Sequence, residues 1–255
     1  MKLEDKVAII PGGTAGIGEQ IALGFVHEGA TVIVASRNRE RVENVSRELK
    51  KLGNKADGMI VDITDKRQVD AMVADVIAKF GKVDIMLNSA GYYPATPVLN
   101  VSEAEWKQVM DINMNGPFYC AQAAAQDMIK RKSGRIIFLT SSQAIHGVPL
   151  MAHYSAAKGG LVALARAMAA EMGVFGVTVN TIACGLTTTD MVNNTIPDGF
   201  QKMIAEEVPL KRLAQPHEYT DLAVLLASEG GAYITAETIV ADGGVANADA
   251  VHTKA

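Results

Sequence analysis

KVAIIPGGTAGIGEQIALGF, residues 6–25, joins an apolar run to a glycine-rich turn and then to an amphipathic segment. The apolar run predicts a buried β-strand, and the recurrence of Ile17, Ile21 and Phe25 at helical spacing predicts a helix after it. The turn between them, PGGTAGIG (11–18), has glycines that let the backbone bend tightly and approach a phosphate closely. The helix N-terminus adds N–H groups and a partial positive charge. A strand, a glycine turn and a helix in this order favour a dinucleotide site over a purely structural turn.

Short β-branched runs alternate with helical patterns along the rest of the chain. The expected strands after the first are TVIVA (31–35), GMIVD (58–62), VDIML (83–87), GRIIFLTS (134–141), VTVNTIA (177–183) and ETIVA (237–241). Seven strands separated by helices indicate a parallel sheet, because parallel strands need crossover connections that are usually helical. The sequence therefore predicts an α/β fold: a single Rossmann-like, doubly wound domain with a seven-stranded parallel sheet and helices on both faces.

The chain shows no linker, internal repeat or low-complexity tract that would divide it. We expect one dinucleotide-binding and catalytic domain over residues 1–245 and a C-terminal tail over 246–255. Long helices are expected at about 102–130 and 153–173. Residues 186–215 break the alternation with threonines and a short amphipathic piece, so this segment is predicted to form a lid.

Composition argues against several classes of protein. The 255 residues are 49% hydrophobic and 20% charged, with a formal net charge of −4. Without a long apolar run, a secretion signal or a basic stripe, neither a membrane nor a nucleic acid is an expected partner. Cys120 and Cys184 lack metal-ligand spacing, so no metal site is expected. A reducing cytoplasm is the predicted location, and a small molecule is the predicted partner.

The end of the second expected strand indicates which dinucleotide is bound. Sites of this type hold the adenosine ribose of NAD with an acidic residue at that point. Here the sequence reads Ser36-Arg37-Asn38, without a carboxylate, and Arg37 is placed to hold a 2′-phosphate by paired hydrogen bonds. NADP(H) is therefore favoured over NAD(H). The alternative is that Arg37 only begins a solvated helix.

Further motifs follow in one order, and with them the chain resembles a member of the short-chain dehydrogenase/reductase family over essentially its whole length. The residues that carry the resemblance are Gly12, Gly16, Ile17 and Gly18 in the turn, Asp62, NSAG (88–91), Asn113 in DINMNG, Ser141 in LTSS, Tyr154 and Lys158, CGLTTTDM (184–191) and ADGG (241–244). The resemblance implies a homotetramer built on the 102–130 helix, the helix after Tyr154 and the last strand.

The resemblance also implies a catalytic set made of Asn113, Ser141, Tyr154 and Lys158. Ser141 is preferred to Ser142 because the family's usual gap between serine and tyrosine is thirteen residues. Ser142 remains the alternative.

Cofactor contacts are implied at both ends of the dinucleotide, with Asp62 on the adenine, Asn88 and Gly91 on the adenosine side, and Thr189 on the nicotinamide amide. The residues expected to bind the cofactor are Gly12, Thr14, Gly16, Ile17, Gly18, Ser36, Arg37, Asn38, Asp62, Ile63, Asn88, Ala90, Gly91, Tyr154, Lys158, Gly185, Thr187 and Thr189. Substrate contacts are expected from Ser141, Gln143, Tyr154, Tyr93 and Met191, in mostly apolar surroundings.

The spacing of Tyr154 and Lys158 has a chemical reason. Residues four apart lie on one face of a helix. Moving a hydride to or from carbon requires a proton to move at the attached oxygen, so the site needs an acid and base that work near neutrality. A phenol has a pKa near 10, and lowering it by about 3 units requires roughly 4 kcal/mol of preference for the phenolate. We expect Lys158 to supply that preference through its charge, Ser141 to donate to the substrate oxygen, and Asn113, by family analogy, to hold a water.

Four residues depart from the family pattern. Pro11 stands in place of a usual threonine, Ser89 in place of an asparagine, Cys184 in place of a proline and Ala236 in place of a frequent glycine. None belongs to the expected catalytic set, so they bear on stability and cofactor affinity rather than on reaction type.

These observations predict an oxidoreductase acting on CH–OH groups, which uses NADP(H) to reduce a small to medium, mainly uncharged ketone or aldehyde. One alternative is an NAD-dependent alcohol dehydrogenase working oxidatively, against which Arg37 argues. Another is a 3-oxoacyl-thioester reductase; relatives acting on acyl carrier protein tend to place an arginine where this chain has Phe175. A non-enzymatic dinucleotide sensor or scaffold is the last, and the intact pair of Tyr154 and Lys158 disfavours it.

Overall fold

The computed structural model describes residues 1–52 and 55–246. Seven strands form one parallel sheet in the order β3-β2-β1-β4-β5-β6-β7. They are β1 (Val7–Pro11), β2 (Thr31–Ser36), β3 (Ala56–Ile60), β4 (Ile85–Asn88), β5 (Gly134–Ser141), β6 (Val177–Cys184) and β7 (Thr238–Ala241). The predicted fold class is confirmed.

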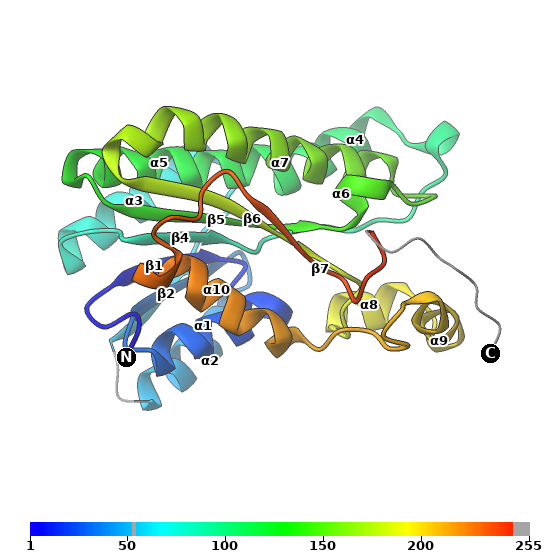
Figure 1. The fold of residues 1–255 in the computed structure, drawn as a ribbon, viewed down its shortest axis with the longest axis horizontal. Helices are drawn as coiled ribbons and strands as arrows, with labels where there is room; N and C mark the ends of the chain where they lie inside the picture. The colour runs from blue at the N-terminus through cyan, green and yellow to red at the C-terminus, as the bar shows by residue number, and fades with distance from the viewer. Residues whose placement is uncertain (53–54, 247–255) are drawn as a thin grey trace.

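Helices cover both faces of the sheet (Figure 1). One face carries α3 (Lys66–Phe80), α5 (Gly116–Arg131) and α7 (Ala152–Met172), and the other carries α1 (Gly16–His27), α2 (Arg39–Lys51) and α10 (Thr220–Ala227). The shorter elements are α4 (Glu103–Met110), α6 (Gln143–His146), α8 (Asp190–Thr195) and α9 (Asp198–Glu207), with 3-10 turns at Val98–Asn100, Gly173–Phe175, Pro216–Tyr219 and Glu229–Gly231. Among the described residues, none of the helices is long and apolar enough to cross a membrane.

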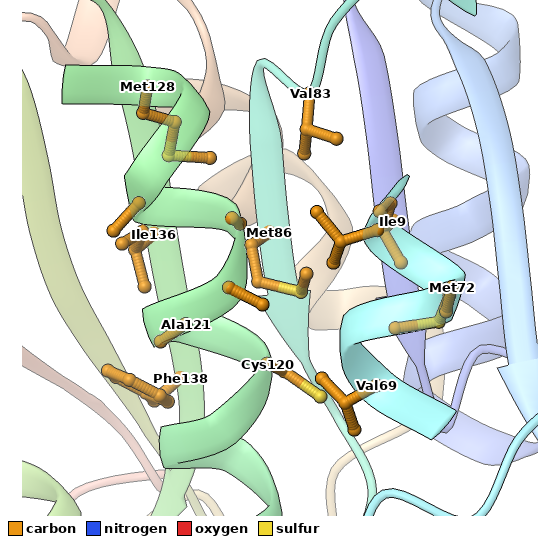
Figure 2. Packing of buried hydrophobic residues seen from close by; sticks show 14 of the residues in the cluster. Ile9, Val69, Met72, Val83, Met86, Cys120, Ala121, Met128, Ile136 and Phe138 are labelled. Carbon is orange, nitrogen blue, oxygen red and sulfur yellow. The ribbon is translucent and has the colours of Figure 1, made fainter. Parts of the chain in front are cut away.

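The core between the sheet and the first helical layer is built around the central strands. Figure 2 shows Met86 of β4 between Ile9 of β1 and Ile136 of β5, and all three side chains are fully buried. Cys120 and Ala121 of α5 face this row and are also fully buried. Because these two side chains are small, α5 can approach the sheet closely while keeping the interior densely packed.

The topology determines where a ligand can bind. The chain runs outward from β1 to β2 and β3, then returns to place β4 on the other side of β1. In such sheets a crevice opens beyond the carboxyl ends of the strands where the order reverses. Gly12 follows β1 and Ser89 follows β4, so the glycine turn and the NSAG segment meet at this crevice.

Some element boundaries differ from the prediction. β3 is Ala56–Ile60 rather than 58–62, and β4 is Ile85–Asn88 rather than 83–87. The helix expected over 102–130 is divided into α4 and α5 by a π-helical turn at Asp111–Asn115. Helical spacing is continuous through this turn, so the apolar pattern does not reveal it.

Residues 186–215 contain α8 and α9, and their role as a lid stays a prediction. Helix α10 is not among the expected elements, because TDLAVLLA is apolar on most sides and has no clear helical period. Of the expected C-terminal tail over 246–255, residues 247–255 lie outside the described residues.

Ala236 occupies a strained backbone conformation, which explains why the family frequently has glycine at this position. Its φ is 63°, in the left-handed region, where a β-carbon costs about 1–2 kcal/mol. Glycine has no such penalty, although it loses more conformational entropy on folding.

Ala236→Gly is therefore expected to raise the free energy of unfolding by about 0.5–1 kcal/mol, measured by urea denaturation. Ala71→Gly, at an exposed position inside α3, serves as the control and should lower it by about 0.5–1 kcal/mol. A loss of stability in Ala236→Gly would contradict the strain argument.

Candidate active site

Two adjoining clefts run along the carboxyl edge of the sheet. The first has a volume of about 310 Å³ and is lined by Ser141, Gln143, Tyr154, Lys158 and Cys184 among others. The second has a volume of about 540 Å³ and is lined by the segment after β2 and the segment after β3. They share the lining residues Ala15, Arg41, Ser89, Gly91 and Met191. The shared residues make the two clefts one continuous site over the reversal of strand order.

The glycine turn forms the floor between the clefts. Gly12 has φ +80°, and a β-carbon there would lie 2.4 Å from the Ala90 nitrogen. A β-carbon on Gly18 would lie 2.4 Å from the Gly12 carbonyl oxygen, so Gly18 packs the helix start onto the turn. α1 begins at Gly16 after Ala15, which gives it no side-chain cap. The first N–H groups of α1 are therefore suited to bind phosphate oxygens.

Pro11 and Ser89, two of the departures, are accommodated beside this turn. The Gly12 N–H donates to the Ala35 carbonyl at 2.8 Å, and the Ser89 N–H donates to the Pro11 carbonyl at 2.9 Å. The end of β1 is thus bonded to both neighbouring strands although Pro11 lacks an N–H.

Tyr154 and Lys158 project from the first turns of α7 toward the end of β5. The Lys158 Nζ lies 5.7 Å from the centre of the Tyr154 ring and donates to the Leu139 carbonyl at 2.9 Å. Lys158 is 4% exposed and Tyr154 is half-buried. Tyr154 also forms a hydrogen bond with Ser141, the last residue of β5. The structure thus brings three of the four expected catalytic side chains together, and the Tyr154 contact favours Ser141 over Ser142.

Burial dominates the acid–base properties of this cluster. It raises the pKa of Tyr154 above its ordinary value, with smaller increases from Tyr93 and Cys184, whereas the hydrogen bond with Ser141 lowers it. Burial lowers the pKa of Lys158 to about 8, and Cys184 partly offsets this. The expectation that Lys158 lowers the pKa of Tyr154 is therefore not met by the protein groups alone, because removing the phenol from water outweighs it.

Asn113 is placed differently from the other three. It lies in the π-helical turn, is fully buried, and donates to the Tyr92 and Val109 carbonyls at 2.9 and 3.0 Å, while its Oδ1 accepts the Tyr92 N–H at 3.1 Å. A β-carbon on Gly91 would lie 3.2 Å from that Oδ1 and 3.9 Å from the Lys158 Nζ. Asn113 therefore fixes the segment beside Lys158 rather than lining the cleft. Its expected contact with a water stays a prediction.

The expected substrate residues are among those that line the first cleft beside Tyr154. The Tyr93 and Tyr154 rings meet edge to face with centroids 5.0 Å apart. Gln143 donates from Nε2 to the Tyr93 hydroxyl at 3.0 Å, and its backbone N–H donates to the Ser141 Oγ at 3.2 Å. Met191 of α8 also lines this cleft.

The second cleft contains the residues expected to select the cofactor, namely Ser36, Arg37, Asn38, Asp62 and Ile63, together with Gly12, Thr14, Ala90 and Gly91. The Arg37 side chain is 64% exposed, and its guanidinium lies 3.9 Å from Asp62 Oδ2. Asn38 caps α2 by accepting the Arg41 N–H. Arg37 is therefore held loosely at the mouth of the cleft, where a phosphate can replace Asp62 as its partner.

Gly16, Ile17, Gly185, Thr187 and Thr189 line the first cleft. Thr187 already bonds the Gly185 carbonyl at 2.9 Å and the Tyr219 hydroxyl at 2.8 Å, and Thr189 accepts the Val192 N–H to cap α8. Asn88 differs from the expectation of a cofactor contact: it is 2% exposed, does not line either cleft, and its side-chain atoms have no hydrogen-bond partner among the described residues.

Arg41 is a cleft residue that the sequence motifs do not indicate, and Asp190 lies in the CGLTTTDM segment but has no expected role. Arg41 lines both clefts, and its guanidinium lies 4.0 Å from Asp190 at the start of α8. Arg37 precedes Asn38, the N-cap of α2, so helical spacing does not link it to Arg41, and the sequence carries no signal that identifies Arg41 as a cleft residue.

These residues fit a nicotinamide dinucleotide carrying a 2′-phosphate. The uncapped start of α1 suits the pyrophosphate, Arg37 suits the 2′-phosphate, and Lys158 and Tyr154 lie at the far end of the continuous cleft.

Comparison with known proteins gives matches over nearly the full chain. Residues 12–246 match the family model described as enoyl-(acyl carrier protein) reductase. The 3-oxoacyl-[acyl-carrier-protein] reductase FabG of Thermotoga maritima is 31% identical over 96% of this chain and 99% of the relative. Subunit BbsD of (2S)-[(R)-hydroxy(phenyl)methyl]succinyl-CoA dehydrogenase from Thauera aromatica is 34% identical over 96% and 98%.

Solved structures agree with these matches. Levodione reductase superposes with a TM-score of 0.93 at 27% identity, over 97% of this chain and 100% of the other. A variant of actinorhodin polyketide ketoreductase with NADPH superposes with a TM-score of 0.91 at 30% identity, over 95% and 98%.

Proposed function

Because the chain belongs to the short-chain dehydrogenase/reductase family, we propose that this oxidoreductase uses NADP(H) to reduce small to medium, mainly uncharged ketones or aldehydes. The observation that carries the proposal is the cluster of Ser141, Tyr154 and Lys158 in a cleft continuous with the glycine turn. When bound, NADP(H) supplies the hydride.

The protein's own part in reduction is to deliver a proton and to hold the carbonyl. Burial keeps Tyr154 protonated near neutrality, so its hydroxyl can donate to the substrate oxygen. Ser141, bonded to Tyr154, offers a second donor to the same oxygen. The Lys158 ammonium stabilises negative charge as the phenol gives up its proton, and it would also hold the nicotinamide ribose.

The cleft wall supports an uncharged substrate. Besides Lys158, the lining residues with charged side chains are Arg41 and Asp190, which lie near each other. The surface around the reacting end comes from Tyr93, Gln143 and Met191 with Leu186 and Val192. A charged substituent in this position would lose water without gaining a partner.

A 3-oxoacyl thioester is the second candidate substrate class, favoured by relatives that are named 3-oxoacyl-[acyl-carrier-protein] reductases. Phe175, in place of the arginine that such enzymes tend to have, disfavours a carrier-protein partner. NAD-dependent oxidation is disfavoured by Arg37, and a sensor without catalysis by the intact cluster of Tyr154 and Lys158.

Preference for NADPH is expected to depend on Arg37. NADPH should bind about 10- to 100-fold more tightly than NADH, because a phosphate held by charge-assisted hydrogen bonds contributes about 1.5–3 kcal/mol. Fluorescence titration with each cofactor measures this ratio. Arg37→Asp should abolish it, whereas Arg39→Asp, at an exposed position in the first turn of α2, should not. Equal affinity of the wild type for both cofactors would overturn the NADP(H) proposal.

Reduction is expected to require Tyr154 and to decline in base. Tyr154→Phe should slow NADPH-dependent carbonyl reduction by a factor on the order of 10²–10⁴. The pKa of Lys158 is lowered to about 8, so its charge is present below that pH and is lost above it. kcat/KM for reduction should therefore be level near neutrality and fall as the pH rises through about 8. A carbonyl screen with both proteins, followed by a pH profile, makes the test. Undiminished turnover by Tyr154→Phe would refute the mechanism.

A homotetramer is expected from two surfaces. The outer side of α7 exposes Ala163, Ala167 and Ala170, and Trp106 on α4 is 43% exposed. β7 is the last strand of the sheet, and its outer edge has no strand partner among the described residues. Light scattering is expected to give a mass four times that of the 27.0 kDa chain. A monomeric mass would contradict the assembly. The expected cytoplasmic location of the protein also stays a prediction.

A further inference from the structure

His153, the residue before Tyr154, forms two side-chain hydrogen bonds that its position in the sequence does not predict. It is fully buried and does not line the substrate cleft. Its Nε2 lies 2.8 Å from Glu105 Oε1 on α4, and its Nδ1 accepts the Tyr154 backbone N–H at 3.0 Å. An N–H can only donate, so Nδ1 is the unprotonated nitrogen and Nε2–H donates to Glu105.

The bond to Tyr154 replaces a missing helix cap. α7 begins after Met151, which forms no side-chain cap, and the early N–H groups of a helix have no partner within it. The approach to α7 is also strained, since Leu150 has φ 69°. His153 therefore accepts the Tyr154 backbone N–H at a helix start where the N-cap residue Met151 provides no side-chain acceptor.

Glu105 extends this contact into a closed network. It accepts a side-chain hydrogen bond from Thr96 as well as the one from His153. The Thr96 backbone N–H in turn donates to the Leu150 carbonyl at 2.9 Å. Glu105 thereby connects α4 to His153, which follows the strained residue Leu150, and to Thr96, which bonds Leu150 itself.

The helix that carries Glu105 also leads into the turn that carries Asn113. Five residues separate the end of α4 at Met110 from the start of α5 at Gly116, and Asn113 lies among them. One helix thus contacts the start of α7 and continues directly into the turn that holds Asn113.

We propose that Glu105 and His153 are positioning residues that hold the start of α7 on α4 and so fix the Tyr154 hydroxyl against Ser141. The proposal rests on the proposed function, in which Tyr154 delivers the proton. Neither residue contacts the reacting atoms. Their loss should reduce turnover without a matching loss of cofactor binding.

The test compares Glu105→Ala, His153→Ala, the double variant and Glu105→Gln, with Glu103→Ala as control. Glu103 is on the same helix, 81% exposed in its side chain, and paired with Lys107 rather than with α7. We expect kcat to fall about 10- to 100-fold in both alanine variants, while the Kd for NADPH stays within about threefold. Glu105→Gln keeps an oxygen that accepts from His153 and should retain most of kcat. The double variant should be no worse than the poorer single variant, because both break one network.

Hydrogen exchange of residues 152–158 gives a measurement that does not need substrate. Exchange should accelerate in Glu105→Ala and His153→Ala, and stay at the wild-type rate in Glu103→Ala and Glu105→Gln. Wild-type kcat in Glu105→Ala, additive losses in the double variant, no rescue by glutamine, or loss of NADPH binding parallel to kcat would each overturn the proposal. If the wild type reduces no carbonyl compound with NADPH, the proposed function fails; unchanged exchange in both alanine variants overturns the positioning role separately.

Discussion

The buried ammonium of Lys158 is the constraint on which the site depends. A charge removed from water is unfavourable unless the protein provides polar partners, and here the Leu139 carbonyl accepts from Nζ at 2.9 Å. That carbonyl belongs to β5, which pairs with β6 along its whole length and is buried at every position. The amine belongs to α7, which packs on the same sheet. The placement of α7 against β5 therefore decides both whether the cation is stabilised and where Tyr154, one turn earlier, points.

The same constraint explains a glycine whose backbone conformation would not require one. Gly91 follows β4, and a β-carbon there would lie 3.2 Å from Asn113 Oδ1, which is a tight contact, and 3.9 Å from Lys158 Nζ. Asn113 uses its amide to bond the backbone of Tyr92 next to it. The NSAG segment is thus a spacer that lets a helix turn, a strand end and the buried lysine meet at the reversal of strand order.

The sequence predicts most of the fold because strands and helices bury faces with different periods, and those periods can be read along the chain. Gly12 and Arg37 could be placed at the cleft because a strand end and a helix start determine their position. The π-helical turn at Asn113, the link from Glu105 to His153 and the cleft position of Arg41 could not. Each depends on how two elements far apart in the sequence pack, and helical spacing is the same with or without them. The pKa of Tyr154 is a related case, because spacing indicates a nearby charge but not the extent of burial that opposes it.

Reaction type and substrate choice depend on parts of the molecule that pack differently against the core. Ser141, Tyr154 and Lys158 come from a buried strand and a long helix, so their geometry is shared wherever this packing is kept. Tyr93 and Met191 come from a loop and from the short helix α8, which make few of the core contacts. Change in those segments can alter the wall of the cleft without disturbing the buried lysine. That separation gives a physical reason why relatives with the same fold have names that refer to acyl carrier protein, a succinyl-CoA derivative and levodione.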